Sequence, residues 1–246
     1  MQPAARGFTG VVASMVRVWG VAALALAPLP VFSADEPANQ GPPQEVFLPK
    51  AQKGPIVVVL SGQSGPPSYR RYAGQLADRG YYTALLDGKD ILTRQQDGAK
   101  NLQTAIARAQ TAANAVPGKV AVIGFSQGGG GVLAHAVSMP DLISMAVVHY
   151  PATSWSKNLD GIAGRIQIPI LVLAAELDRY NNNCCGIESM RELETAAKAK
   201  QKPLELVVYP KADHGFNLDG RQYRSDDTAD AWKRATEMLD RYQPVK

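Results

Sequence analysis

Cysteine, histidine and dense positive charge are scarce in this sequence, and each scarcity excludes a class of protein. The 246 residues include two cysteines, too few for the four ligands of a structural zinc site, so we expect no metal site. The net charge is +4, and no lysine and arginine stripe with interleaved aromatic residues occurs, which argues against nucleic-acid binding. Internal repeats and low-complexity tracts are also missing. The remaining feature is a hydrophobic content of 46%, enough for one substantial core.

A long hydrophobic run is missing as well. A transmembrane helix needs about 20 apolar residues, whereas the longest run near the N-terminus, residues 18–27, is shorter and is followed by Pro28 and Pro30. This run comes after an acid-free segment that contains Arg6 and Arg17. The arrangement predicts a secretory signal peptide over residues 1–34. We therefore expect no stable membrane anchor, and export to a bacterial periplasm or beyond.

After the signal, the sequence predicts a linker and one α/β domain. Residues 35–54 are polar and proline-rich, with a possible edge strand at Glu45–Leu48, and residues 55–246 form the domain. Strands are predicted at 55–60, 81–86, 119–123, 144–150, 168–175 and 204–209, and helices at 69–79, 99–116, 132–136, 190–197 and 229–239. This alternation predicts a mostly parallel sheet of about seven strands with helices on both faces. Ligands then bind at the carboxyl ends of the strands.

One stretch organises the domain, the Gly-x-Ser-x-Gly motif at residues 124–128. Such a motif by itself also fits an ordinary tight turn, but here a buried strand precedes it and a helix follows. In this setting the glycines permit a sharp turn that exposes the hydroxyl of Ser126 above the sheet. The helix start then offers the backbone N–H of Gln127 to an oxyanion beside the serine. Ser126 is therefore the predicted nucleophile.

A serine nucleophile needs a base, and three histidines are available. His135 falls within the helix after the serine, and His149 ends a strand before the region where an acid would come. His214 follows the last strand in a loop, where a base at a strand tip belongs. His214 is the predicted base.

The base needs an orienting carboxylate, which this chain order places between the serine and the histidine. Asp178 follows the strand that ends at residue 175 and is the predicted acid, with Glu176 as its main rival and Asp213 as a weaker one. Asp87 precedes the serine and is interpreted as a cap of its own loop.

Three segments together resemble the dienelactone hydrolase family of α/β-hydrolases. They are Gly-Phe-Ser-Gln-Gly-Gly at 124–129, Glu-Leu-Asp at 176–178 and Tyr-Pro-Lys-Ala-Asp-His-Gly-Phe at 209–216. Further support comes from residues 76–81 and from the segment around Trp232, so the resemblance runs from about Pro55 onward. It implies the α/β-hydrolase fold and a second oxyanion donor at the backbone N–H of Gln63.

The sequence departs from this family at the nucleophile. Dienelactone hydrolases proper have a cysteine there, whereas this chain has Ser126, which moves the expectation toward ordinary ester or lactone hydrolysis. The Gly-Phe-Ser-Gln-Gly-Gly string is also similar to that of carboxylesterases and acyl-protein thioesterases. We therefore predict a serine hydrolase that acts on a small-molecule ester or lactone without a cofactor.

Two alternatives stay open at this point. One is a thioesterase or a lipid-directed acyl hydrolase, although no long lid insertion is visible. The other is a catalytically silent binding protein, because a fold alone does not imply activity. The sequence indicates no oligomeric state.

Two further features lie close to the predicted acid. Arg179 is a candidate ligand for a substrate carboxylate. The adjacent Cys184 and Cys185 could form a vicinal disulfide, bridge to another chain or stay free, and we interpret them mainly as structural.

Overall fold

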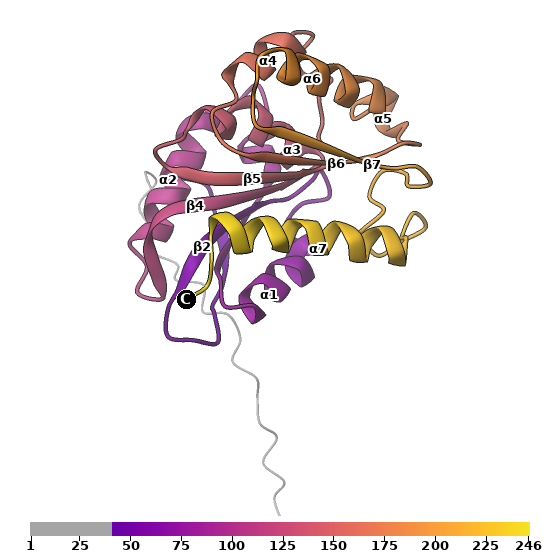
Figure 1. The fold of residues 1–246 in the computed structure, drawn as a ribbon. Helices are drawn as coiled ribbons and strands as arrows, with labels where there is room; N and C mark the ends of the chain where they lie inside the picture. Colours follow the sequence, from indigo (N-terminus) through magenta and orange to yellow (C-terminus); the bar gives the residue numbers. More distant parts are fainter. Residues whose placement is uncertain (1–40) are drawn as a thin grey trace, which may run out of the picture. The chain divides into compact units, whose positions relative to one another are not determined.

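The computed structural model describes residues 41–246, and its centre is a seven-stranded sheet in the order β1-β3-β2-β4-β5-β6-β7 (Figure 1). The strands are β1 (Gln44–Phe47), β2 (Gly54–Leu60), β3 (Tyr82–Leu86), β4 (Ala115–Phe125), β5 (Ile143–His149), β6 (Ile170–Ala175) and β7 (Leu204–Tyr209). β1 pairs antiparallel with β3, and all other pairs are parallel. The predicted signal, residues 1–34, lies outside the described residues.

Helices cover both faces of the sheet. They are α1 (Arg70–Asp78), α2 (Gly98–Gln110), α3 (Gln127–Ala134), α4 (Leu159–Arg165), the single turn α5 (Tyr180–Asn183), α6 (Ile187–Ala199) and α7 (Ser225–Tyr242). α1 and α7 lie on one face, and α2, α3, α4 and α6 on the other (Figure 1). Along β2, Val58 packs on the face covered by α2, α3, α4 and α6. Its neighbours Val57 and Val59 pack on the face covered by α1 and α7. The uninterrupted apolar strands are thus buried on both sides, as a parallel sheet requires.

The predicted α/β-hydrolase fold is confirmed, with most strand ends within two residues of their predicted positions. The predicted helix over 99–116 is wrong at its C-terminal end, because α2 stops at Gln110 and β4 already begins at Ala115. The periodic pattern placed Ala113 on the apolar face, yet this residue is exposed. At the end of the helix, the hydroxyl and the backbone N–H of Thr111 both donate to the carbonyl of Arg108.

Two of the α-helices, α4 and α5, were not predicted. α4 starts after Asn158, whose side-chain oxygen caps the helix by accepting from the N–H of Gly161 at 2.7 Å. α5 is one irregular turn beside the predicted acid. Among residues 41–246, no helix is long and apolar enough to cross a membrane.

Candidate active site

Ser126 occupies the sharp turn between β4 and α3. Its backbone angles, φ 47° and ψ −111°, lie in a region that non-glycine residues rarely adopt. The flanking glycines permit this turn, because a Cβ on Gly124 would lie 2.7 Å from the carbonyl oxygen of Gly128, and one on Gly128 would lie 2.4 Å from that of Leu60. The N–H of Ser126 donates to the carbonyl of His149 at 3.0 Å. The packing of α3 against β2 therefore fixes the position of the serine.

The structure brings the predicted base and acid to this serine. Nε2 of His214 lies 3.0 Å from Oγ of Ser126, and Nδ1 lies 2.7 Å from Oδ2 of the fully buried Asp178. The N–H of Leu177 donates to the carbonyl of Ala212, which joins the loop after β6 to the loop after β7. A carboxylate can only accept, so Nδ1 carries the proton and Nε2 is free to accept from the serine hydroxyl.

The two predicted oxyanion donors flank the same serine. Gln127 is the first residue of α3, and Gln63 lies in the loop after β2. A Cβ on Gly62 would lie 3.2 Å from Cβ of Ser126, so this loop packs directly against the serine. Within residues 41–246, neither the N–H of Gln63 nor that of Gln127 has a hydrogen-bond acceptor. Both remain available to a ligand.

Tyr180 is a site residue that the sequence analysis missed. Its ring stacks on the imidazole of His214, with centroids 4.3 Å apart and planes 6° apart. Its hydroxyl donates to Oε1 of Gln63 at 3.1 Å, and its N–H donates to Oδ1 of Asp178 at 3.0 Å. The one available signal was an aromatic residue two positions after the predicted acid. Tyr180 links the acid, the base and the loop after β2.

The other two histidines do not contact the serine hydroxyl. His149 is buried beneath the site, where burial lowers its pKa to about 3, and its Nδ1 lies 3.1 Å from the amide nitrogen of Asn217. His135 lies on the wall of a neighbouring cavity, where partial burial and the charge of Arg165 lower its pKa. His214 is therefore the histidine in reach of Ser126.

The rival carboxylates have partners elsewhere. Glu176 accepts from the guanidinium of Arg191 at 2.7 Å. Asp213 accepts from the backbone N–H of His214 and shapes the loop rather than orienting the ring. Asp87 caps its own loop by accepting from the N–H of Lys89, as predicted.

Two cavities meet at the serine. One of about 450 Å³ is lined by His214 and Leu218, and one of about 670 Å³ is lined by Gln127 and Trp155. Both share the residues Gln63, Ser126 and Tyr180 as walls. A ligand attacked by the serine can therefore extend to either side of it.

Arg179 lies on the wall of the smaller cavity, but its charge is partly engaged. One guanidinium nitrogen donates to the carbonyl of Asp178 at 3.0 Å, and the other lies 3.6 Å from a carboxylate oxygen of Glu188. Its role in substrate binding stays a prediction.

The two cysteines form a disulfide with each other. Cys185 also belongs to a set with Asp178 and His214 whose potential metal-ligand atoms lie within 4.8 Å of one another. A disulfide sulfur carries no thiolate, so in this state the set offers two ligands, fewer than a structural or catalytic zinc site uses.

Comparison with known proteins shows the family to which this sequence belongs. The model of the dienelactone hydrolase family matches residues 84–243. A "Putative carboxymethylenebutenolidase" of Saccharolobus solfataricus is 28% identical over 219 residues, which cover 89% of this chain and 78% of that protein. A protein of the same name from Escherichia coli O157:H7 is 30% identical over 131 residues, and there the match spans about half of each protein, 50% of this chain and 46% of the relative.

A solved structure shows the same fold. Esterase 2 of Thermogutta terrifontis, phosphorylated by paraoxon, superposes with a TM-score of 0.66 at 20% identity, covering 82% of this chain and 89% of that one. The family match covers more than half of the chain and includes the serine, the acid and the histidine. The chain therefore belongs to the dienelactone hydrolase family of α/β-hydrolases.

Proposed function

We propose that this protein is a serine hydrolase that cleaves a small carboxylic ester or lactone through an acyl-enzyme intermediate. The observation that carries the proposal is the position of His214, within hydrogen-bond distance of both Ser126 Oγ and the buried Asp178. A serine hydroxyl is a weak nucleophile until a base accepts its proton, and this arrangement supplies that base and its orienting acid.

The reaction follows from the same contacts. Nε2 of His214 takes the proton of Ser126 as Oγ attacks the carbonyl carbon, and Asp178 stabilises the imidazolium that forms. The imidazolium then gives its proton to the leaving alkoxide, which departs and leaves an ester on Ser126. Water, deprotonated by His214, hydrolyses that ester and restores the serine. In a lactone the leaving alcohol stays joined to the acyl group through the ring carbons, so hydrolysis of the ester on Ser126 releases a single hydroxy acid.

The N–H groups of Gln63 and Gln127 would bind the oxyanion of each tetrahedral intermediate. Donors of this kind contribute most when they are positioned before charge develops, and the loss of one typically costs about 2.7–4 kcal/mol. Both are backbone groups, so side-chain substitution does not remove them. The unused N–H groups beside Ser126 support this assignment.

The size of the site supports a small substrate. Cavities of about 450 and 670 Å³ on the two sides of the serine fall within the range that small-molecule sites occupy. The family match and the related esterase fold support an ester bond as the target. Thioesters and long-chain esters are the competing substrates, and comparison of kcat/KM on acetyl, longer acyl and thioester substrates distinguishes them.

An activated serine is tested by labelling with a fluorophosphonate and measuring the intact mass. We expect one adduct on the wild type and none on Ser126→Ala or His214→Ala, because the first lacks the nucleophile and the second lacks its base. Either variant is expected to lower kcat/KM by roughly 10⁴-fold or more. The related esterase 2, which paraoxon phosphorylates, supports the choice of probe.

A matched control is Ser138→Ala, which changes an exposed serine whose hydroxyl donates to the carbonyl of His135. This variant is expected to form the adduct. A folded wild type that forms no adduct and cleaves no ester would contradict the hydrolase mechanism and would favour a binding protein on the same fold.

We propose in addition that the protein is exported and that residues 1–34 are removed. The apolar run at 18–27, the preceding arginines and the small residues Ser33 and Ala34 support this. Expression in a Gram-negative bacterium followed by fractionation and intact mass is the test. Recovery of the full-length chain from the cytoplasm alone would contradict it.

A further inference from the structure

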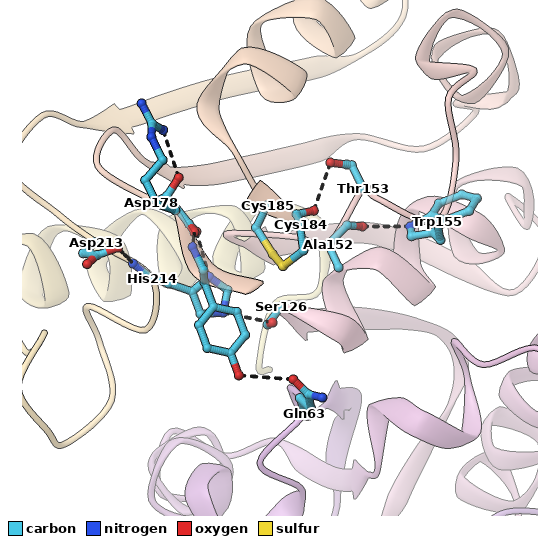
Figure 2. The surroundings of a disulfide bond; sticks show 12 residues. Gln63, Ser126, Ala152, Thr153, Trp155, Asp178, Cys184, Cys185, Asp213 and His214 are labelled. Carbon is cyan, nitrogen blue, oxygen red and sulfur yellow. Dashed lines mark hydrogen bonds and ion pairs between the residues drawn. A yellow bond between two sulfur atoms is a disulfide. The ribbon is translucent and has the colours of Figure 1, made fainter. Parts of the chain in front are cut away.

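The disulfide between Cys184 and Cys185 has no part in the proposed mechanism, yet it lies at the centre of the site. Both residues are buried, and Figure 2 shows them between the acid and the loop that follows β5. A disulfide stabilises a fold mainly by closing a loop in the unfolded chain, and its effect grows with loop length. Neighbouring cysteines close the shortest loop possible. The contribution of this bond is therefore local.

On one side, the disulfide is tied to the backbone of the nucleophile. The carbonyl of Cys184 accepts from the N–H of Thr153 at 2.7 Å and from the N–H of Ser154 at 3.1 Å. The adjacent Ala152 donates its N–H to the carbonyl of Ser126 at 2.8 Å. Two hydrogen-bonded contacts, joined by the peptide bond between Ala152 and Thr153, thus connect the carbonyl of Cys184 with the carbonyl of Ser126.

On the other side, the disulfide lies close to the acid and the base. Sγ of Cys185, a carboxylate oxygen of Asp178 and a ring nitrogen of His214 lie within 4.8 Å of one another. The N–H of Cys184 donates to the carbonyl of Tyr180 at 3.1 Å, and Tyr180 is the residue stacked on His214. The disulfide therefore borders both groups that hold the imidazole.

The segment between Tyr180 and the disulfide has an unusual backbone. Asn181, Asn182 and Asn183 are all left-handed, with φ of 43°, 58° and 59°. Asparagine tolerates this conformation better than most residues, but three in succession persist only where the surroundings hold them. The disulfide between Cys184 and Cys185, which follows Asn183 directly, can hold this conformation in place.

We propose that the Cys184–Cys185 disulfide is a redox-sensitive brace of the active site. The oxidised pair holds Asp178 and Tyr180 against His214, and reduction by a dithiol releases them and lowers turnover. Reduction also places a thiol hydrogen on Cys185, a weak donor that competes for the carboxylate of Asp178. The proposal rests on the ester hydrolysis proposed above.

The reduction step is ordinary thiol–disulfide exchange. A thiolate of the dithiol attacks Sγ of Cys184, a residue that lines the larger cavity. The electrons of the broken S–S bond leave with Cys185, which takes up a proton. The second thiol of the reagent then closes on the mixed disulfide and releases Cys184 as a thiol. Two electrons and two protons pass to the protein, and the reagent becomes a cyclic disulfide.

The first test compares the oxidised and reduced wild type. Dithiothreitol is the reductant, and thiols are counted by alkylation of a denatured sample followed by intact mass. With para-nitrophenyl acetate we expect kcat to fall roughly 10- to 100-fold on reduction, with a smaller change in KM, because the imidazole is misplaced rather than the substrate. Reoxidation restores the rate. Two free thiols with kcat unchanged would overturn the proposal.

A variant separates the disulfide from the reagent. The double substitution Cys184→Ser/Cys185→Ser is expected to have the low kcat of the reduced wild type and to be indifferent to dithiothreitol. Circular dichroism and thermal unfolding are expected to change little on reduction. A loss of rate that parallels global unfolding would contradict a local role of the disulfide. Should the variant fail to fold, the reversible reduction of the wild type still decides.

A signal that needs no substrate separates this inference from the proposed function. The proton on Nδ1 of His214, hydrogen-bonded to Asp178, gives a downfield proton resonance that His214→Ala identifies. We expect reduction to broaden or shift this resonance. An oxidised protein without esterase activity would overturn the hydrolase proposal, and the resonance would still report on the brace. An unchanged resonance after full reduction would overturn the brace alone.

Discussion

At the scale of single residues, Tyr180 connects the parts of the site through its aromatic ring, its hydroxyl and its backbone N–H. It lies flat on His214, and its hydroxyl reaches Gln63 across the site. Because its backbone N–H also holds Asp178, this one residue contacts the acid, the base and the loop after β2.

Two substitutions of Tyr180 separate the ring from the hydroxyl. Tyr180→Phe keeps the stack and loses one hydrogen bond, so we expect kcat to fall by less than about tenfold. Tyr180→Ala removes the ring that confines His214, and kcat is expected to fall roughly 10- to 100-fold. Steady-state kinetics on para-nitrophenyl acetate measures both. Equal rates for the two variants would show that the stack does not position the base.

His149 predicts a pH dependence of stability. Its pKa is about 3 in the folded protein because of burial, against 6.5 when unfolded, so between these values the unfolded state binds more protons. The free energy of unfolding therefore decreases as the pH falls from 6.5 toward 3, by up to about 1.4 kcal/mol per pH unit from this residue. In urea unfolding, His149→Phe is expected to show a shallower decrease than the wild type. Parallel curves would contradict the assignment.

The roles of individual residues could be predicted only where their chemistry is tied to a strand end. Ser126, Asp178 and His214 each follow a strand of a parallel sheet, and the carboxyl ends of such strands converge. The stack of Tyr180 on His214 could not be predicted, because it depends on how two loops far apart in the sequence meet, and no hydrophobic period specifies their path.

At the scale of elements, the contact between α3 and β2 sets the position of the serine, and glycines make that contact possible. Gly128→Ala would place a methyl group 2.4 Å from a backbone oxygen of Leu60, which cannot move without disturbing the sheet. We expect a loss of about 3 kcal/mol or failure to fold. Gly74→Ala in α1 is the matched control, since a Cβ there meets nothing within 4 Å.

The control has a predicted sign of its own. Gly74 lies in a helix, so alanine is expected to stabilise the protein by about 0.5–1 kcal/mol. Thermal and urea unfolding of both variants provide the measurement. Similar effects of the two substitutions would indicate that helix propensity, rather than the close approach at Gly128, dominates.

Helices and strands were predictable where the hydrophobic period and the residues that end an element agree. The central strands are continuous apolar runs ending at glycine or polar residues, and their positions follow the sequence closely. The end of α2 could not be predicted in this way, because the alanines near Ala113 fit the helical period but contribute little to the core. Small apolar residues indicate a helix only weakly. The pattern therefore did not show that the helix ends at Gln110.

At the scale of the whole molecule, Gln243 joins three central strands near their N-terminal ends, which lie opposite the serine. Its amide nitrogen donates to the carbonyl of Lys119 at 2.8 Å and weakly to that of Ile56, and its oxygen accepts from the hydroxyl of Ser144 at 2.9 Å. One side chain from the end of the chain thus joins β2, β4 and β5.

Replacing this glutamine is expected to affect stability and not catalysis. Gln243→Ala removes these hydrogen bonds from partly buried groups, which we expect to cost about 1–3 kcal/mol. We expect kcat/KM to stay the same, because the substitution lies at the opposite ends of the strands from Ser126. Gln52→Ala, at an exposed side chain, is the control and is expected to change stability by less than about 0.5 kcal/mol. A drop in kcat/KM of folded Gln243→Ala would contradict this separation.

Trp155 gives the molecule an optical reporter of its own. Its indole nitrogen donates to the carbonyl of Ala152 at 2.8 Å (Figure 2). Trp155 lines the larger cavity together with Cys184. Indole emission responds to the polarity around the ring and is quenched by nearby disulfides. Filling the cavity or opening the disulfide should therefore change the fluorescence of Trp155. Trp155→Phe leaves Trp19 and Trp232 of the full-length chain as the background. Ligand screening and stopped-flow measurements can use this emission without any added dye.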